Sequence, residues 1–148
     1  EIVQANRAYH TGADPMERLL ARAHFQGAVE RGGRYVLVDD VTTMGSTLAD
    51  LAHHIQAGGG EILGVVVLVS ASRTGALAPP RKTVVKLERR FGDEIRSIFG
   101  VSPEALTADE ARYLIGFRNA EELRGRAAKA AEERGHRLRA KGIREGLG

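Results

Sequence analysis

Two adjacent carboxylates and a run of hydroxyl side chains are the residues best suited to chemistry in this sequence. Asp39 and Asp40 end an apolar run, and residues 42–47 (Thr-Thr-Met-Gly-Ser-Thr) follow one position later. Hydroxyl groups and the amides of a glycine-bearing loop can donate hydrogen bonds to phosphate oxygens. Adjacent carboxylates instead suit the hydroxyls of a sugar, or a metal held through water. The string therefore predicts a site for a phosphorylated sugar.

A strand and a helix must position these residues. Residues 35–38 (Tyr-Val-Leu-Val) are typical of a buried strand, and apolar residues recur at helical spacing from Leu48 to Ile55. This order places the loop at a helix N-terminus, where unpaired amides and the helix dipole favour an anion. The loop lacks the lysine of a nucleoside-triphosphate P-loop, which argues against that class. A strand that ends in a simple turn, with both acids solvated or capping, is the structural alternative.

Residues 38–48, Val-Asp-Asp-Val-Thr-Thr-Met-Gly-Ser-Thr-Leu, resemble the phosphoribosyl-pyrophosphate (PRPP) loop of type I phosphoribosyltransferases. The resemblance implies that Asp39 and Asp40 hold the ribose hydroxyls. It implies that the loop binds the 5′-phosphate through Thr42, Thr43, Met44, Gly45, Ser46 and Thr47. Mg²⁺ is expected to reach this site through PRPP and water near the aspartates, without direct protein ligands. Met44 departs from the pattern, because a small or hydroxyl residue is usual there.

Two features of the family pattern are missing from the sequence. No strand, loop and helix series precedes residue 35 to bind the pyrophosphate of PRPP. We therefore expect either a fragment of a longer protein or an incomplete site. Thr43 stands where 6-oxopurine enzymes of the family have an aspartate near the purine. The resemblance thus points away from hypoxanthine and guanine as acceptors, without selecting another base.

A polar segment before the motif corresponds to the family's closing loop. Residues 7–22 occupy the place from which that loop covers pyrophosphate, and they supply cations at Arg7, His10, Arg18 and Arg22. Arg7 and His10 are the candidates for a catalytic role, which the sequence leaves unassigned. The alternative for Arg18 and Arg22, four residues apart, is the solvated face of a helix.

The hydrophobic pattern predicts an α/β fold with a helical extension. A β-branched run at residues 62–69 is typical of a central parallel strand covered on both faces, and residues 83–87 are expected to form a third strand. We expect a Rossmann-like, type I phosphoribosyltransferase-like parallel-sheet domain over residues 1–90, and its completeness at the N-terminus is left open. A helical C-terminal extension is expected over residues 91–148.

Local signals add detail to this outline. Two capping boxes predict helix starts, at Asp14 with Glu17 and at Thr107 with Glu110. The loop after residue 69 would bring Arg73 and Thr74 to the ligand side of the sheet, as candidates to touch a base or a phosphate.

Composition and charge narrow the class of protein. The chain has 148 residues, 43% of them hydrophobic, which is enough for one domain with a core. The absence of cysteine excludes disulfides, thiol catalysis and zinc–thiolate sites. No apolar run has the length of a membrane span, and the expected location is the cytoplasm. The net charge of +3 comes from the second half, since residues 1–80 carry six Lys and Arg against eight Asp and Glu.

The basic C-terminus admits a binding role. Residues 107–126 faintly resemble a helix-turn-helix, although the usual spacing is missed and charges alternate in sign. A basic tail follows, consisting of Arg134, Arg137, Arg139, Lys141 and Arg144. It would suit RNA, DNA or an acidic partner, and a solvated tail or a packing and dimerisation element is the alternative. A homodimer is therefore among the partners left open, and no membrane is expected.

Two functions follow from these observations, and a third is weaker. The first is Mg²⁺-dependent transfer of phosphoribosyl from PRPP to a nitrogenous base, with release of pyrophosphate. The second is a non-catalytic regulator that binds PRPP or a nucleoside 5′-monophosphate and contacts nucleic acid or protein through its helices. The third is an α/β interaction domain with a degenerate site. Oligomeric state and acceptor base are not readable from the residues.

Overall fold

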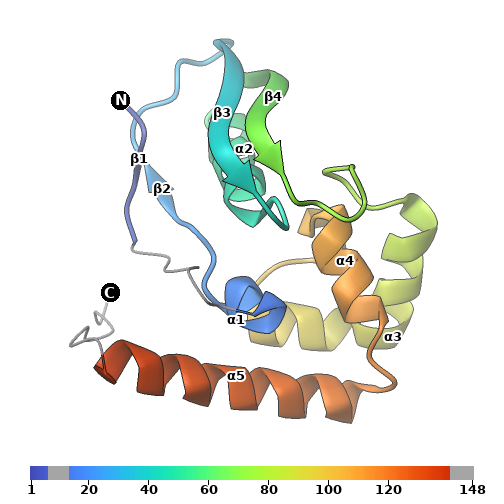
Figure 1. The fold of residues 1–148 in the computed structure, drawn as a ribbon. Helices are drawn as coiled ribbons and strands as arrows, with labels where there is room; N and C mark the ends of the chain where they lie inside the picture. Colours follow the sequence, from blue (N-terminus) through green and yellow to red (C-terminus); the bar gives the residue numbers. More distant parts are fainter. Residues whose placement is uncertain (7–13, 141–148) are drawn as a thin grey trace.

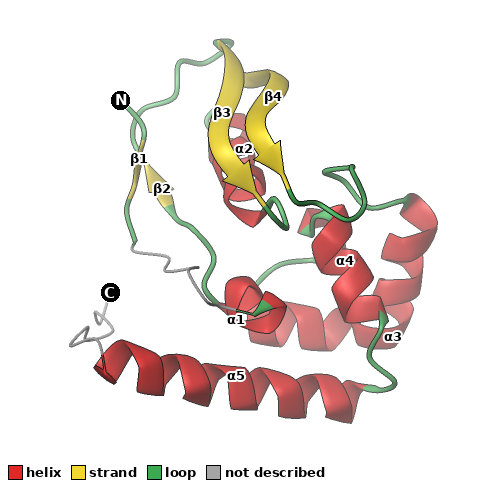
Figure 2. Ribbon diagram, in the orientation of Figure 1, coloured by secondary structure: helices red, strands yellow, loops and turns green. Residues whose placement is uncertain are grey.

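The computed structural model describes residues 1–6 and 14–140, which form two lobes (Figure 1). The sheet lobe consists of β3 (Arg34–Thr42), α2 (Ser46–Ala57) and β4 (Glu61–Ser70). The helical lobe consists of α1 (Pro15–Leu20), α3 (Arg81–Phe99), the 3₁₀ turn η1 (Pro103–Ala105), α4 (Ala108–Ile115) and α5 (Ala120–Ala140). Two short strands, β1 (Val3–Gln4) and β2 (Phe25–Gln26), pair antiparallel. Figure 2 shows β3, β4 and α2 together, apart from the other helices.

The sheet lobe is a strand–helix–strand unit. β3 and β4 pair in parallel from Arg34 opposite Glu61 to Thr42 opposite Ser70, with a register shift after Tyr35. α2 makes the crossover and lies behind the two strands in Figure 1. The inward residue Leu37 packs against the apolar face of α2 in a small buried cluster with Leu48 and Ile55. The predicted strand, loop, helix and strand order is therefore confirmed.

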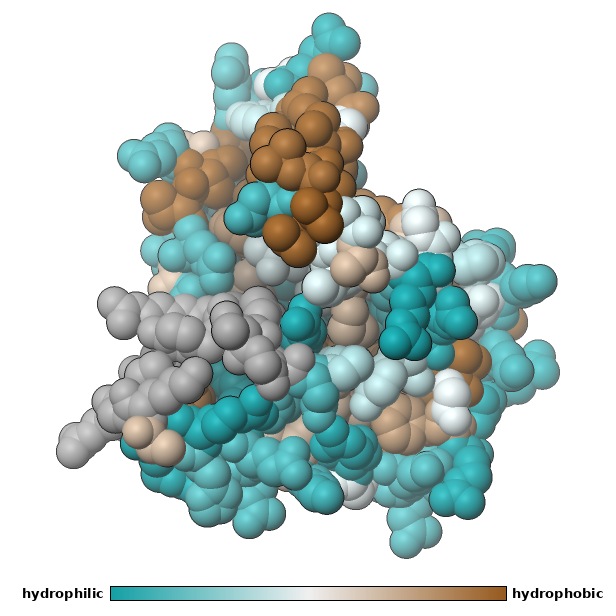
Figure 3. Space-filling view, viewed as in Figure 1, coloured by the Kyte–Doolittle hydropathy of each residue, from teal (hydrophilic) through white to brown (hydrophobic). Residues whose placement is uncertain are grey.

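The opposite face of this sheet is exposed, which corrects one expectation. Within the described residues β4 pairs with β3 alone, and its front face is not covered as a central strand would be. Val38 is 72% exposed and Leu68 is 82% exposed, and both lie on the face turned away from α2. Figure 3 shows their side of the sheet as an apolar surface. The β-branched run at residues 62–69 predicted a strand correctly and its burial wrongly.

The helical lobe contains most of the buried core. Leu87, Phe91, Ile95 and Phe99 recur every four residues along α3 and are all buried. They pack against α4, α5 and α1 in a cluster of twelve buried apolar residues. The predicted third strand at residues 83–87 is wrong, because this stripe draws those residues into the start of α3.

Helix boundaries in this lobe follow local signals. Both predicted capping boxes are present, at the start of α1 and at the start of α4. α3 ends at Gly100, which has a left-handed backbone with φ of 70°. The expected boundary at residues 90 and 91 lies inside α3, and α1 joins the helical lobe although it precedes the sheet in sequence. The division into residues 1–90 and 91–148 stays a prediction, as does the phosphoribosyltransferase-like fold.

No helix in the described parts of the chain combines the length and the apolarity needed to cross a membrane.

Candidate functional site

The loop between β3 and α2 depends on one glycine. Gly45 has a left-handed backbone, with φ of 74° and ψ of 9°. A side chain there would be strained, and its Cβ would lie 3.0 Å from Leu77 Cδ1. Gly45 therefore lets the chain turn sharply from the strand into the first turn of α2.

The N-terminus of α2 has no side-chain cap. Gly45 occupies the N-cap position, where serine, threonine, asparagine or aspartate usually accepts a hydrogen bond from the first turn. The first turn of the helix contains Ser46, Thr47 and Leu48, and it contains no acidic residue. Amides of an uncapped first turn and the helix dipole together form a favourable environment for an anion.

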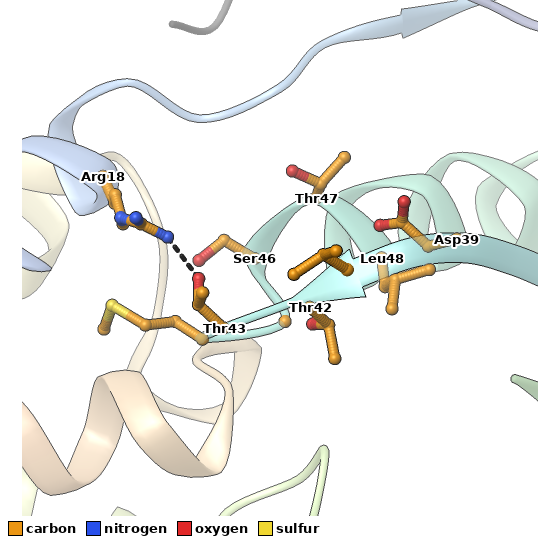
Figure 4. A pocket seen from close by; sticks show the side chains of 10 residues that line it. Arg18, Asp39, Thr42, Thr43, Ser46, Thr47 and Leu48 are labelled. Atoms are coloured by element: carbon orange, nitrogen blue, oxygen red, sulfur yellow. Dashed lines mark hydrogen bonds between the residues drawn. The ribbon is translucent and has the colours of Figure 1, made fainter. Parts of the chain in front are cut away.

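A cavity of about 330 Å³ opens over this turn (Figure 4). It is lined by Arg18, Asp39, Val41, Thr42, Thr43, Met44, Gly45, Ser46, Thr47 and Leu48. The structure thus brings the six predicted phosphate-loop residues and one predicted ribose-binding aspartate to a single cavity. This volume lies at the lower end of the range for small-molecule sites.

The two aspartates face different ways. Asp39 is half-buried on the α2 side of β3 and lines the cavity. Asp40 lies on the exposed side of the strand, where its carboxylate accepts a hydrogen bond from the Val41 amide at 2.7 Å. Alternation along a strand separates neighbouring side chains in this way. The structure therefore places Asp39 at the cavity, while a ribose contact by Asp40 stays a prediction.

Arg18 reaches the loop from the helical lobe. Its guanidinium donates a hydrogen bond to the Thr43 hydroxyl, drawn as the dashed line in Figure 4. Arg18 is half-buried and lines the cavity. Its place on α1 is also compatible with the alternative prediction, the solvated face of a helix. A cation therefore stands beside the candidate phosphate site.

A second cavity of about 500 Å³ adjoins the first. Arg18, Thr43 and Met44 line both cavities. The second cavity adds Arg73 from the loop after β4 and Arg112 from α4. Its walls combine cations with apolar side chains, so it can receive a partly charged group next to the loop.

Asp109 of α4 fixes the loop that carries Arg73. Its carboxylate accepts hydrogen bonds from the Ser72 hydroxyl at 2.5 Å and from the Thr74 amide at 3.1 Å. Both neighbours of Arg73 are thereby held against α4. The Thr74 amide thus helps to anchor the loop, while a ligand contact by Arg73 or Thr74 stays a prediction.

Arg22 has a role different from that of Arg18. Its guanidinium forms ion pairs with Asp50 at 2.9 Å and with Glu110 at 3.2 Å, and its side chain is only 9% exposed. Burial alone lowers the pKa of Arg22, but Glu110 and Asp50 outweigh it and raise the pKa above the ordinary value. Arg22 is therefore a buried structural cation. It is found neither in the pyrophosphate-covering role nor on the solvated helix face that the sequence predicted.

Glu110 is the residue at this site that sequence reasoning missed. Its side chain is fully buried, and it accepts a hydrogen bond from the Ser46 hydroxyl at 2.5 Å. The capping box that it forms with Thr107 was the visible signal, but the contact with Ser46 spans 64 residues and has no local signature.

The remaining candidates lie apart from the cavities or outside the described residues. Arg7 and His10 fall in residues 7–13, outside the described part, as do Lys141 and Arg144 of the basic tail. Arg137 forms an ion pair with the buried Glu17, so its charge serves the packing of α5 on α1.

The described residues contain no group of three or more His, Cys, Asp or Glu side chains arranged to hold a metal. Among the residues placed by the structure, one carboxylate, that of Asp39, lines the cavity. This donor set fits a divalent ion held mainly by phosphate oxygens and water, as Mg²⁺ commonly is.

Comparisons with known proteins found two relatives. The chain is 31% identical over 142 residues to protein TraN of Escherichia coli, covering 93% of this chain and 32% of TraN. It is 38% identical over 60 residues to orotate phosphoribosyltransferase of Pyrobaculum aerophilum, covering 40% of this chain and 31% of that enzyme. No family model matches the chain, and no solved structure gives a significant match.

The two matches cover different shares of this chain. The chain spans about one third of the length of each relative. The similarity to TraN extends over nearly all of this chain, both lobes included, whereas the similarity to a phosphoribosyltransferase is confined to 60 residues. The comparisons therefore support a phosphoribosyltransferase relationship for part of the chain.

Proposed function

We propose that the loop between β3 and α2 binds the 5′-phosphate and ribose of PRPP, and that the protein transfers phosphoribosyl to a nitrogenous base. One observation carries the proposal. The Gly45 turn, the uncapped first turn of α2 and the carboxylate of Asp39 line one cavity. The partial similarity to an orotate phosphoribosyltransferase supports the same reading.

Each part of the cavity has a role in this proposal. The amides of the first turn and the hydroxyls of Thr43 and Thr47 hold the 5′-phosphate, and Asp39 accepts hydrogen bonds from the ribose hydroxyls. Arg18 faces the loop from α1 and balances negative charge there. Mg²⁺, when bound, would neutralise charge on the pyrophosphate. The second cavity, with Arg73 and Arg112, has room for the groups attached to C1 of ribose.

The reaction is a substitution at C1 of ribose. A ring nitrogen of the base forms a bond to C1 while the bond from C1 to the pyrophosphate oxygen breaks. Pyrophosphate leaves with the bonding electron pair, and the nitrogen loses its proton to solvent. Positive charge develops on the ribose, so positioning and electrostatic support supply most of the rate enhancement.

Calorimetric titration with PRPP and Mg²⁺, followed by assay of pyrophosphate release with a panel of bases, tests the proposal. Binding with release in the presence of one base is the expected result, and Asp39→Asn should weaken binding about tenfold or more. The matched control is Asp93→Asn, an exposed carboxylate on α3 that lines neither cavity. Binding without release from any base would contradict the transferase and favour the non-catalytic binder. Absence of binding would contradict both.

A further inference from the structure

A fully buried carboxylate joins the two lobes directly behind the phosphate loop. Glu110, on α4 of the helical lobe, accepts a hydrogen bond from the hydroxyl of Ser46, the first residue of α2. Its second oxygen accepts a hydrogen bond from the Thr107 amide, at 2.8 Å, as part of the capping box. One side chain therefore ties the start of α4 to the start of α2.

Arg22 extends the connection along α2. It donates to Glu110 at 3.2 Å and, through Nε and Nη2, to Asp50 at 3.1 and 2.9 Å. Asp50 lies one turn after Ser46 on the same side of α2. Its other oxygen accepts a hydrogen bond from the Ala23 amide at 3.1 Å. The first turn of α2 is thus held at both ends by a network of Ser46, Asp50, Glu110 and Arg22, which we call the junction network.

Such a network is a costly way to hold two lobes together. Removing charged groups from water costs free energy that pairing only partly returns, so apolar residues of similar volume would often stabilise the fold as well or better. A buried polar network does, however, fix geometry more narrowly than apolar contacts do. The part of the chain that it fixes is the turn whose residues line the cavity.

The network also determines what Ser46 can do. A hydroxyl has one proton to donate, and that proton is directed at Glu110. Ser46 therefore cannot donate the same proton to a bound phosphate. Thr47, the next residue, lines the cavity without a place in the network. Two adjacent hydroxyls of the loop thus have different roles, which gives a matched pair for experiment.

We infer that Glu110 is a positioning residue, which holds the phosphate-binding turn of α2 in its binding conformation and couples it to the helical lobe. This inference rests on the proposed function for the identity of the ligand. Through Glu110, the helical lobe contributes to ligand binding at the loop. Because coupling is reciprocal, ligand at the loop stabilises the contact between α2 and α4.

A double-mutant cycle on PRPP affinity tests the inference. Glu110→Gln keeps the volume but loses one acceptor and the charge, and Ser46→Ala removes the donor. Each is expected to weaken binding, by roughly threefold to a hundredfold, and the double variant should bind no more weakly than the worse single variant. Thr47→Val should also weaken binding, but its effect should multiply with that of Glu110→Gln.

A stability control separates positioning from simple destabilisation. Ile95→Val trims the helical core away from the junction network and should lower thermal stability while leaving PRPP affinity unchanged. If Glu110→Gln behaves like Ile95→Val, or if its effect multiplies with that of Ser46→Ala, the inference is overturned.

Hydrogen exchange without ligand makes the test independent of the proposed function. Glu110→Gln should speed exchange at the amides of residues 49–52, whose hydrogen bonds to residues 45–48 close the first turn of α2, relative to Ile95→Val, even if PRPP proves not to bind. Failure of PRPP binding in the wild-type chain would overturn the proposed function alone. Unchanged exchange at these amides would overturn the positioning role of Glu110.

Discussion

The two lobes of this protein bury very different amounts of apolar surface. Among the residues that the structure describes, the helical lobe contains a continuous cluster of twelve buried apolar residues, whereas the cluster of the sheet lobe contains three. The sheet lobe also exposes an apolar face of β3 and β4 to solvent. Yet the loop with the features of a ligand site belongs to the sheet lobe. Stability and candidate chemistry are therefore concentrated in different parts of the chain.

The sheet lobe needs support from other parts of the chain. Two paired strands with one helix form a small unit, and a sheet of that size depends on packing partners for stability. The described structure supplies one such partner through the junction network and through Arg18, which both connect the loop to the helical lobe. The helical lobe thus holds the loop in position.

The largest expected effect of a single change is in the helical core. Phe91→Ala should lower the free energy of unfolding by about 3–5 kcal/mol, because a fully buried aromatic ring leaves a cavity among well-packed neighbours. Val85→Ala on the same helix, at a site 49% exposed, is the control and should cost far less. Urea unfolding followed by circular dichroism measures both. Equal losses would contradict the assignment of the core to this stripe of α3.

A smaller effect is expected in the sheet lobe. Leu37→Ala should cost about 2–3 kcal/mol, near the lower end for buried leucine, because the small cluster around it can relax. Val38→Ala, one position along on the exposed face, should change stability by only a few tenths of a kcal/mol. Hydrogen exchange at the amides of β3 and β4 reports on this lobe separately. A greater loss from Val38→Ala would show that the front face of the sheet is covered in solution.

These contrasts show what sequence reasoning could and could not predict. The helix starts at α1 and α4 were predictable because each capping box places both partners within three residues. The third strand at residues 83–87 was a wrong prediction, since two adjacent valines suggested β-structure while the stripe ending at Phe99 extended beyond that window. The longer pattern held the correct signal.

The site was predictable only in its local part. The order of strand, glycine loop and helix located six loop residues and Asp39 at one cavity. The buried pairing of Arg22 could not be predicted, because Asp50 and Glu110 lie 28 and 88 residues away in sequence. Contacts between residues so far apart in sequence depend on how the lobes pack, and no motif in the loop indicates that packing.

The smallest expected effect concerns a surface carboxylate of the helical lobe. The Arg118 amide, which donates to Glu122 at 2.8 Å, lowers the pKa of Glu122, and the Arg118 side chain adds to this. A carboxylate whose folded pKa is depressed stabilises the fold above its unfolded pKa and loses that contribution as pH falls through the folded value. Glu122 should therefore favour folding at neutral pH and cease to do so in acid.

An NMR pH titration of Arg118→Ala and wild type checks this origin. The variant keeps the backbone donor, so the pKa of Glu122 should remain below its ordinary value. A return to the ordinary value would assign the shift to the ion pair instead of the amide.

An NMR titration of the labelled chain with PRPP and Mg²⁺ tests most directly whether the loop between β3 and α2 binds a phosphoribosyl group. We expect saturable shifts at the amides of Gly45, Ser46 and Thr47, with a smaller response in α4 transmitted through Glu110. Asp39→Asn should move the titration to higher ligand concentration. Saturable shifts confined to other surfaces, or no shifts at all, would contradict a phosphoribosyl site at this loop.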